Sequence, residues 1–349
     1  MKDKLVLGID TSCDDTSVAV LEGRRVLSSI VSSQLEIHAK WGGVVPDIAR
    51  REHEKNIDRV YNEALKVAKV CIEDIDYIAV TYGPGLAIDL EVGINFAKEL
   101  SKKKDIPLIP VNHMEGHLLS PLLLNSKGKG LLEKNIEEIF PALGLLISGK
   151  HTEIVRVDGI GEYEKIGQTL DDAAGEAFDK VGRILNFGFP GGPVVTEFAK
   201  KGKRGNIVFP IPMKSSGDLN FSFSGIKTAA LYKSKELRED DIPEKEWVYD
   251  FCRGFVDSVY ESIALKLSEA IKKEYDVKSV LVGGGVFNSE EILRRVGKLV
   301  RSYSIDFYYP EQKYRGDNAA MIALVGFLNR DTGVIEDITV LDREPRLSL

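Results

Sequence analysis

The sequence repeats one order of strands and helices, and this repeat restricts the possible folds more than any other feature. Near the N-terminus an apolar run, residues 5–10, is followed by the polar turn 11–16 and a second apolar run, 17–21. A glycine turn then leads into a third apolar run, 26–31. Short apolar runs separated by polar turns predict consecutive β-strands. The segment 44–69 that follows is predicted to be a helix.

The same order returns about 140 residues later in the chain. The apolar runs 142–147 and 153–157 flank the polar turn 148–152, and a predicted helix, 171–185, comes after them. A strand, polar turn, strand and helix that recur in this way indicate two copies of one α/β unit. Turns of this kind can offer backbone N–H groups to phosphate oxygens.

A glycine-rich turn in the second half supports the same architecture. The three glycines 283–285 lie between a predicted strand, 280–282, and a predicted helix, 288–300. A strand, a glycine turn and a helix start together form a site for a nucleotide phosphate. One such turn is weak evidence, but three polar or glycine turns in this order favour a nucleotide-binding fold.

We therefore predict an α/β protein with two RNase H-like domains of the actin/hexokinase/Hsp70-like nucleotide-binding fold, facing a central cleft. The N-terminal domain is expected at residues 1–111, completed by the C-terminal helix and tail, 318–349. The C-terminal domain is expected at 112–317, with inserted helices. The length of 349 residues suits two domains of ~150–200 residues each.

Composition excludes several classes of function. The chain has no apolar run near the ~20 residues that a membrane span needs, and no signal peptide is recognisable, so we expect a cytoplasmic protein without a membrane contact. Three widely spaced cysteines fit a reducing compartment. The net charge of −7 argues against unaided coating of nucleic acid, so RNA contacts must use local basic patches or a partner.

Two histidines four residues apart are the strongest chemical signal. His113 and His117 are two of only five histidines in the chain. On a helix, residues at this spacing share one face, with Cβ atoms roughly 5–6 Å apart, so both imidazoles can reach one metal ion. Taken alone, the pair is equally compatible with two ordinary core or surface histidines.

Glu115 separates this pair from a zinc protease motif. The protease motif places its glutamate directly after the first histidine, so that it faces the metal-bound water. Glu115 instead follows His113 by two positions, which turns the helix by about 200° and directs the acid away from the metal face. The pair is therefore predicted to supply two ligands without the protease base.

Beyond these patterns, the chain resembles the bacterial TsaD family of tRNA threonylcarbamoyladenosine-forming transferases. The matching stretches occur in order through nearly the whole chain, and so many separate motifs make the resemblance very specific. They are residues 8–14, 82–86, 112–117, 170–181, 189–193, 221–228 and 316–323.

The resemblance implies one divalent metal per chain, usually iron, held by two histidines and an aspartate that match His113, His117 and Asp317. We expect Fe²⁺, with Zn²⁺ as the alternative. By itself, an aspartate before a helix such as 318–329 is a common N-cap. Two imidazoles and one carboxylate leave coordination positions open, as a Lewis-acid site requires.

The resemblance also implies a set of substrate contacts. These positions match Leu146, Ile147, Ser148, Gly149 and Lys150 in the polar turn of the second repeat, together with Asp179, Gly192 and Asn288. Asp179 is expected to reach a ribose hydroxyl, although a solvated helix acid is the simpler interpretation. Gly192 also has a simpler interpretation, as part of a turn before a helix with Pro193 at the first helical position.

The chain departs from the family pattern in three places. Lys150 replaces a glycine; it is strained if that position needs a positive φ, and otherwise adds an ammonium group near the phosphate. Asn288 lies one place before the asparagine of the family, whose position Ser289 occupies, which puts the adenosine contact in doubt. Residues 88–91 replace a small apolar stretch, and an interface there is expected to differ.

The implied reaction moves a threonylcarbamoyl group from threonylcarbamoyl-AMP to the N6 amine of the tRNA adenosine 3′ of the anticodon. A mixed anhydride is already activated, so polarisation and positioning suffice without a protein nucleophile. Cys13 and Ser148 lack a histidine base at recognisable spacing, and no general base is assigned. The implied partners are tRNA, a TsaB-like dimerisation partner and a TsaE-like ATPase, with a TsaC-like enzyme supplying the adenylate.

Four alternatives compete with this prediction. A small-molecule kinase of the same fold has no need of the histidine pair, and Glu115 is misplaced for a metalloprotease. A hydrogenase-maturation carbamoyltransferase needs extra domains and cysteine-paired zinc motifs. A non-catalytic paralogue is expected to lose the metal ligands. Lys150 keeps a catalytically weakened paralogue as the remaining alternative.

Overall fold

The chain forms two compact units, each built on one mixed five-stranded sheet. The computed structural model describes residues 4–132, 135–239 and 243–349. The first unit comprises residues 1–138, 159–163 and 308–349, and the second comprises 139–158 and 164–307. The sequence-based domain boundary differs, because it assigned 112–138, 159–163 and 308–317 to the second domain. The segment that begins at 112 joins the first unit through the helix that carries His113, which packs against the last helix of the chain.

The first sheet has the strand order β3-β2-β1-β4-β5. Strands β1, β2 and β3 form an antiparallel meander, with Leu5 opposite Glu22, whereas β4 and β5 run parallel to β1. The predicted strands of the first repeat are all present. The bounds are β1 Leu5–Asp10, β2 Asp15–Glu22, β3 Arg25–Ser33, β4 Tyr77–Gly83 and β5 Leu108–Asn112.

The helices of the first unit have clear start and stop signals in the sequence. Pro46 begins α2, where its missing N–H costs nothing, and Lys69 ends it in the left-handed conformation. The α-helices are α1 Leu35–Ala39, α2 Pro46–Ala68, α3 Ala87–Lys104, α4 His113–Leu119 and α10 Ala319–Leu328. Short 3₁₀ turns are Ile72–Asp74, Ser120–Leu122, Ile136–Ile139 and Gln312–Tyr314.

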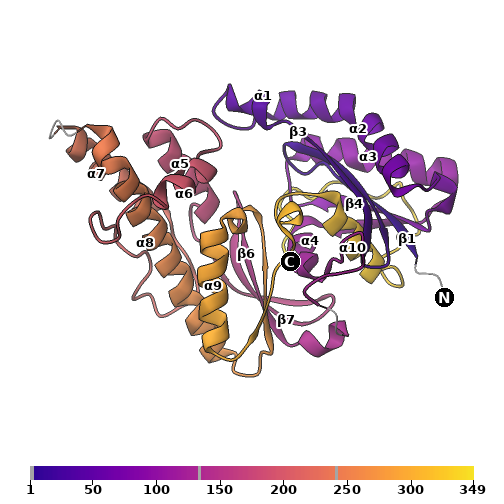
Figure 1. The fold of residues 1–349 in the computed structure, drawn as a ribbon. Coiled ribbons are helices and arrows are strands. Elements are labelled where there is room, and N and C mark those ends of the chain that lie inside the picture. Colours follow the sequence, from indigo (N-terminus) through magenta and orange to yellow (C-terminus); the bar gives the residue numbers. More distant parts are fainter. Residues whose placement is uncertain (1–3, 133–134, 240–242) are drawn as a thin grey trace. The chain divides into compact units, whose positions relative to one another are not determined.

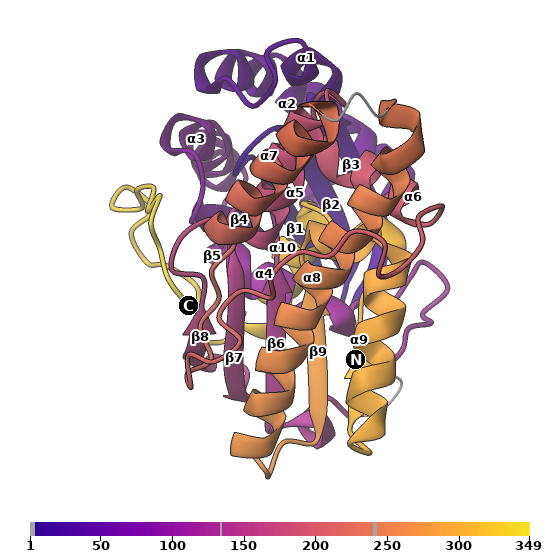
Figure 2. The same ribbon diagram turned by 90° about the vertical axis from the view of Figure 1, so that its left-hand side faces the viewer.

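The second sheet repeats the order of the first, as β8-β7-β6-β9-β10. Strands β6 and β7 pair antiparallel, with Ala142 opposite Val157, and β9 runs parallel to β6. Figure 2 shows β8, β7, β6 and β9 side by side, with α8 and α9 running alongside them. The bounds are β6 Ala142–Ile147, β7 Thr152–Gly159, β8 Glu162–Gln168, β9 Ser279–Gly283 and β10 Asp306–Tyr308.

Five α-helices and one 3₁₀ turn of the described residues complete the second unit. Helix α5 begins at Ala174, so Asp171 precedes the helix rather than sharing it with Asp179, as the sequence had suggested. Asp171 instead accepts hydrogen bonds from Phe223 N at 2.8 Å, just before α7, and from Ser224 N at 3.3 Å, at the first residue of α7. The helices are α5 Ala174–Ile184, α6 Gly191–Ala199, α7 Ser224–Glu239, α8 Glu244–Lys273 and α9 Glu290–Ser302, with the 3₁₀ turn η4 at Gly285–Asn288.

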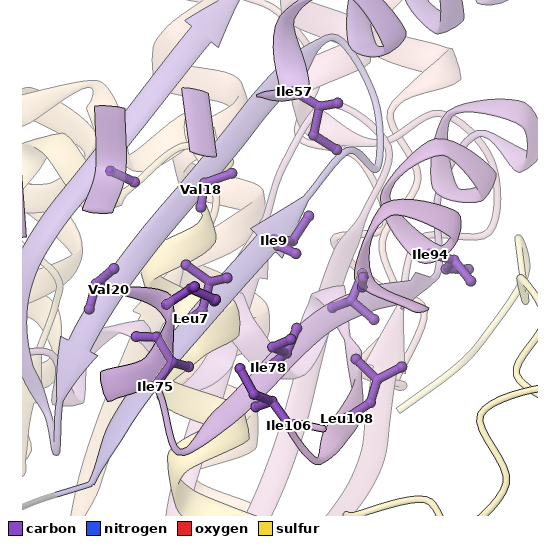
Figure 3. Packing of buried hydrophobic residues seen from close by; sticks show 14 of the residues in the cluster. Leu7, Ile9, Val18, Val20, Ile57, Ile75, Ile78, Ile94, Ile106 and Leu108 are labelled. Atoms are coloured by element: carbon purple, nitrogen blue, oxygen red, sulfur yellow. The ribbon is translucent and has the colours of Figure 1, made fainter. Parts of the chain in front are cut away.

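Apolar side chains of the first sheet pack against α2 and α3. Figure 3 shows Ile9 and Val18 of the first two strands on the side of Ile57 of α2, Val20 near Leu7 and Ile75, and Ile94 of α3 on the side of Leu108. Burial of such side chains from water is the main favourable contribution to folding, worth roughly 1.5–3 kcal/mol for each large aliphatic residue. This core holds the end of β1, where Asp10 lies, in a fixed place.

Helix α10 covers the other face of the first sheet (Figure 1). All of its residues are apolar or glycine. Two glycines allow it to approach closely. A Cβ at Gly8 of β1 would lie 2.3 Å from the carbonyl oxygen of Ala319, and one at Gly326 would lie 2.5 Å from Ala79 Cβ. The N-terminus of α10 is therefore held against the end of β1, close to α4.

Candidate metal centre and substrate turns

Helix α4 presents both histidines from one short segment. It follows directly after β5, and the Asn112 side chain caps it by accepting a hydrogen bond from Met114 N at 2.9 Å. The rings of His113 and His117 lie with centroids 4.8 Å apart and planes at 86°. As predicted, the two residues share one helix and one face.

Asp317 joins the pair from the loop before α10. Its Oδ1 lies 3.1 Å from His117 Nε2 and 3.5 Å from His113 Nε2. The N-cap of α10 is Asn318, whose side chain accepts from Met321 N, so Asp317 does not serve as the cap. One ligand atom from each of the three residues lies within 4.8 Å of the others. Two nitrogens and one carboxylate oxygen suit a transition metal.

The electrostatics of the three residues match a cation site. Burial raises the pKa of Asp317, but the two histidines hold it well below its ordinary value. Burial lowers the pKa of His113, yet the carboxylates of Asp10 and Asp317 raise it to about 10. In the metal-free chain a proton on His113 balances the carboxylates of Asp10 and Asp317. A divalent ion can supply the same compensation, because metal ligation displaces that proton.

Two further polar residues lie behind His113, and sequence reasoning did not select either. Ser12 Oγ lies 3.2 Å from His113 Nδ1, and Asp10 Oδ2 lies 3.6 Å from the same nitrogen. Among the described residues Asp10 Oδ2 has no hydrogen-bond partner, and neither has the buried His117 Nδ1. The available signal was the acid at the end of β1, where an apolar run meets a polar turn.

Glu115 points away from the metal face, as its spacing predicted. Its Oε1 accepts hydrogen bonds from the Tyr163 hydroxyl at 2.9 Å and from Asn329 Nδ2 at 3.2 Å. The carboxyl group is buried, and burial raises its pKa. These partners give Glu115 a role in packing α4, and they disfavour the metalloprotease interpretation.

In the second unit, the polar turn after β6 folds around the hydroxyl of Ser148. Ser148 Oγ accepts from Lys150 N at 3.3 Å and from His151 N at 3.1 Å. Lys150 is exposed, and its φ lies outside the left-handed region. Lysine is therefore not strained at this position, and the strain interpretation of this departure has no support. Leu146 and Ile147 are buried strand residues, so only their backbone can contact a ligand.

Two helix starts approach this turn closely. Gly175 N, in the first turn of α5, donates to the carbonyl oxygen of Ser148 at 3.2 Å, and a Cβ at Gly175 would lie 2.4 Å from that oxygen. Gly284, with φ +101°, would place a Cβ 2.4 Å from the carbonyl oxygen of Ile147. Glycine is needed at both positions, and the turn after β6 meets α5 and the glycine turn after β9.

Asp179 lies one turn along α5 and holds the start of α6. Its Oδ1 accepts from Gly191 N at 2.9 Å and from Gly192 N at 3.1 Å. Burial raises the pKa of the Asp179 carboxyl group. The structure thus brings Asp179 and Gly192 together as one arrangement, and the solvated-acid interpretation of Asp179 is wrong.

The asparagine departure has a local explanation. Asn288 is the exposed last residue of η4, and Ser289 caps α9 by accepting from Ile292 N at 3.5 Å. Serine is a favoured N-cap, so the hydroxyl at 289 is used by the helix. The candidate residues therefore form two groups, the metal ligands in the first unit and the turn residues in the second.

No helix among the described residues is both long enough and apolar enough to cross a membrane.

In the first repeat, residues 88–91 lie in the first turns of α3, where Asp89 is buried and Glu91 pairs with Arg343 at 3.5 Å.

Solved structures with similar folds are distant in sequence. Component A of the (R)-2-hydroxyglutaryl-CoA dehydratase of Acidaminococcus fermentans matches 94% of this chain and 99% of its own, at 14% identity and a TM-score of 0.54. HypF of T. kodakarensis matches 97% of this chain and 49% of its own, at 14% identity and a TM-score of 0.59. These likenesses confirm the predicted fold class and carry no function.

The sequence comparisons identify the family. The family model described as TsaD, tRNA N6-adenosine threonylcarbamoyltransferase, matches residues 25–324. A protein of that name from Thermosipho africanus is 42% identical over 99% of this chain and 100% of its own. One from Thermodesulfovibrio yellowstonii is 46% identical over 96% of this chain and 97% of its own. One from Clostridioides difficile is 40% identical over 100% of this chain and 99% of its own. The resemblance seen in the motifs is confirmed, and the chain belongs to the TsaD family of tRNA N6-adenosine threonylcarbamoyltransferases.

Proposed function

We propose that this enzyme takes the threonylcarbamoyl group from threonylcarbamoyl-AMP and transfers it to N6 of the tRNA adenosine 3′ of the anticodon, position 37. The proposal includes one divalent metal per chain, Fe²⁺ with Zn²⁺ as the alternative, held by His113, His117 and Asp317. The observation that carries it is the meeting of these three side chains, from α4 and from the start of α10, with their ligand atoms within 4.8 Å.

The residues around this centre fit a bound cation. Both Nε2 atoms are directed to Asp317 Oδ1, while His113 Nδ1 lies near Ser12 and Asp10. A histidine ligand whose second ring nitrogen lies beside a carboxylate is a recurrent feature of metal sites, because the carboxylate fixes the ring orientation.

The transfer does not require a nucleophile from the protein. When bound, the metal supplies a Lewis acid that polarises an oxygen of the mixed anhydride. The residues of the turn after β6, Ser148, Gly149 and Lys150, are proposed to hold the phosphate end of the adenylate. Electrostatic stabilisation and positioning of an activated carbonyl are sufficient contributions, because AMP is a good leaving group.

The nucleotide end of the adenylate is assigned to the second unit. Asp179 is proposed to accept a ribose hydroxyl while Gly191 N and Gly192 N orient its carboxylate. Asn288, exposed at the end of η4, is the proposed adenosine contact. Leu146 and Ile147 contribute backbone groups, since their side chains are buried.

We further propose a set of protein partners. A TsaB-like dimerisation partner and a TsaE-like ATPase are expected to act with this chain in the cytoplasm, and a TsaC-like enzyme to supply the adenylate. The net charge of −7 supports the need for partners, since an acidic chain is a poor binder of tRNA.

A reconstitution tests the whole proposal. The reaction combines the purified chain with unmodified tRNA, threonine, bicarbonate, ATP, an adenylate-forming TsaC-like enzyme and the partner proteins. The nucleosides of the tRNA are then analysed by mass spectrometry. Threonylcarbamoyladenosine should appear only when this chain is present. Its matched control is a chain with His113 and His117 replaced by alanine. Equal product with and without the chain would disprove the proposal.

A further inference from the structure

The last residues of the chain pack on the motif Gly83-Pro84-Gly85. This motif has no role in the proposed metal site or in the proposed substrate contacts. We call residues 344–348 the tail segment. Glu344 N donates to the carbonyl oxygen of Tyr82 at 2.7 Å, and Gly85 N donates to that of Pro345 at 3.3 Å. A Cβ at Gly83 would lie 2.0 Å from the Glu344 carbonyl oxygen. Glycine is thus required at 83 for the tail segment to approach β4.

The chain is anchored to α3 just before the tail segment, and the segment closes a turn of its own. Before it, Leu341 is buried in the core, and its carbonyl oxygen accepts from Lys98 Nζ of α3 at 2.6 Å. Arg343 pairs with Glu91 of α3 at 3.5 Å. Within it, Leu347 N donates to the carbonyl oxygen of Glu344 at 3.0 Å and closes a turn. The segment is therefore docked through backbone and side-chain contacts.

One route leads from the tail segment to His113 through the glycine motif. Immediately after Gly85, Leu86 N donates to the carbonyl oxygen of Ser12 at 2.9 Å. A Cβ at Gly85 would lie 2.6 Å from the same oxygen. Ser12 Oγ in turn lies 3.2 Å from His113 Nδ1. The turn that receives the tail segment also supports the residue behind the first histidine.

A second route is shorter and uses a single amide group. Asn112 Nδ2 donates to the carbonyl oxygen of Ser348 at 3.0 Å, while its Oδ1 accepts from Met114 N at 2.9 Å. His113 is the first residue of the helix that this side chain caps. The Ser348 carbonyl therefore holds the amide in the orientation that keeps its oxygen toward the helix.

We propose that the tail segment is a positioning element of the metal centre, which fixes His113 against His117 and Asp317 through Asn112 and Ser12. The inference rests on the proposed metal site. Both histidines come from a helix of seven residues, which is too short to be stable without tertiary support. Ligands must be held within about 0.5 Å, so loss of this support should weaken the metal complex.

The test measures Co²⁺ affinity of the metal-free full chain by calorimetry and by the visible absorption of the Co²⁺ complex. A chain ending at Arg343 lacks the tail segment, and we expect it to bind Co²⁺ about 10- to 100-fold more weakly, the range found when outer-shell partners of ligands are lost. The matched control is Arg346→Ala, because Arg346 is exposed within the same segment. It should bind as the wild type does.

A second variant separates the link from the helix cap. Asn112→Asp keeps the oxygen that accepts from Met114 N but removes the donor to Ser348. The added charge is present in both chain lengths, so the comparison with the shortened chain isolates the lost link. We expect weaker binding in the full chain and no weakening when the same change is made in the shortened chain. If the shortened chain does not fold, Gly83→Ala in the full chain displaces Glu344 and should give the same loss.

The outcomes separate the two proposals. Equal Co²⁺ affinity of the wild type, the shortened chain and Asn112→Asp would overturn the role of the tail segment and leave the metal site standing. Absence of Co²⁺ binding by the wild type would overturn the metal site and this inference together.

Discussion

The hydroxyl of Tyr163 donates to Glu115 Oε1 at 2.9 Å, and this bond settles the orientation of the acid between the two histidines. Asn329 Nδ2 donates to the same oxygen at 3.2 Å. The glutamate therefore packs α4 on the side away from the ligands. An acid held in this way is not available as the general base of a metalloprotease, whose glutamate must reach a metal-bound water.

Replacement of Glu115 should affect stability rather than chemistry. Glu115→Gln keeps the accepting oxygen, so we expect transfer activity within a few-fold of the wild type. Glu115→Leu removes this partner from the half-buried Tyr163 and should cost about 1–3 kcal/mol in the free energy of unfolding, measured in urea. Tyr163→Phe in the Leu variant should recover part of that loss. A Gln variant without transfer activity would assign Glu115 a chemical role instead.

Replacement of both metal histidines should remove the ion and leave the fold. The variant His113→Ala/His117→Ala keeps only Asp317 of the three ligands, and one carboxylate cannot hold a transition metal at micromolar concentration. We expect no bound metal by elemental analysis, no transfer and an unchanged circular dichroism spectrum. His151→Ala, in the second unit, is the matched control and should retain one metal per chain. Full occupancy in the double variant would contradict the ligand assignment.

Lys150 should strengthen adenylate binding through its charge. Because its backbone is unstrained, the ammonium can pair with the AMP phosphate, worth ~1–3 kcal/mol as a charge-assisted hydrogen bond. Lys150→Gly should weaken binding of a non-hydrolysable adenylate analogue, and the loss should shrink as ionic strength rises. Lys150→Arg should keep most of the affinity. Tighter binding or faster transfer by the glycine variant would identify the lysine as an obstruction and the protein as a weakened member of its family.

The isolated chain should bind tRNA weakly and with a steep dependence on salt. The net charge is −7, and the basic clusters at 102–104 and 200–204 are short. Phosphate contacts release counterions, so the affinity measured by filter binding should fall severalfold or more between 50 and 200 mM salt. Addition of the dimerisation partner and ATPase should raise it. Tight binding by the chain alone that does not change with salt would contradict this account.

Asp15 should make the metal-free chain less stable as the pH rises. Burial, more than the nearby carboxylates of Asp317, Asp14 and Asp10, raises the pKa of Asp15 to about 7. Between about pH 4 and 7 the folded state then binds more protons than the unfolded state, so stability falls by up to about 1.4 kcal/mol per pH unit and levels off above pH 7.

The variant Asp15→Asn removes this titration. Stability is measured by urea unfolding with a chelator present. The Asp15→Asn variant should be more stable, relative to the wild type, at pH 8 than at pH 5. Asp58→Asn, on the exposed side of α2, controls for the loss of one negative charge and should change little between the two pH values. A difference between Asn and wild type that is the same at both pH values would refute the raised pKa.

Local sequence patterns were sufficient for the elements and for part of the metal site. The two apolar runs around residues 11–16 and around 148–152 became antiparallel hairpins, because alternation of strand and polar turn is a short-range property. The histidine pair was correctly placed on one helix face for the same reason, since a spacing of four residues fixes the geometry within one turn. The resemblance of the motifs supplied the family.

The remaining parts of the site depend on contacts between residues far apart in the chain. Asp317 meets His117 across 200 positions, Ser12 meets His113 across 101, and Ser348 meets Asn112 across 236. Each contact exists because α10 packs tightly on β1 through Gly8 and because the tail segment fits over Gly83. Such close approach is decided by the packing of whole elements, where the absence of a single Cβ permits contact, and no periodicity within the local sequence encodes it.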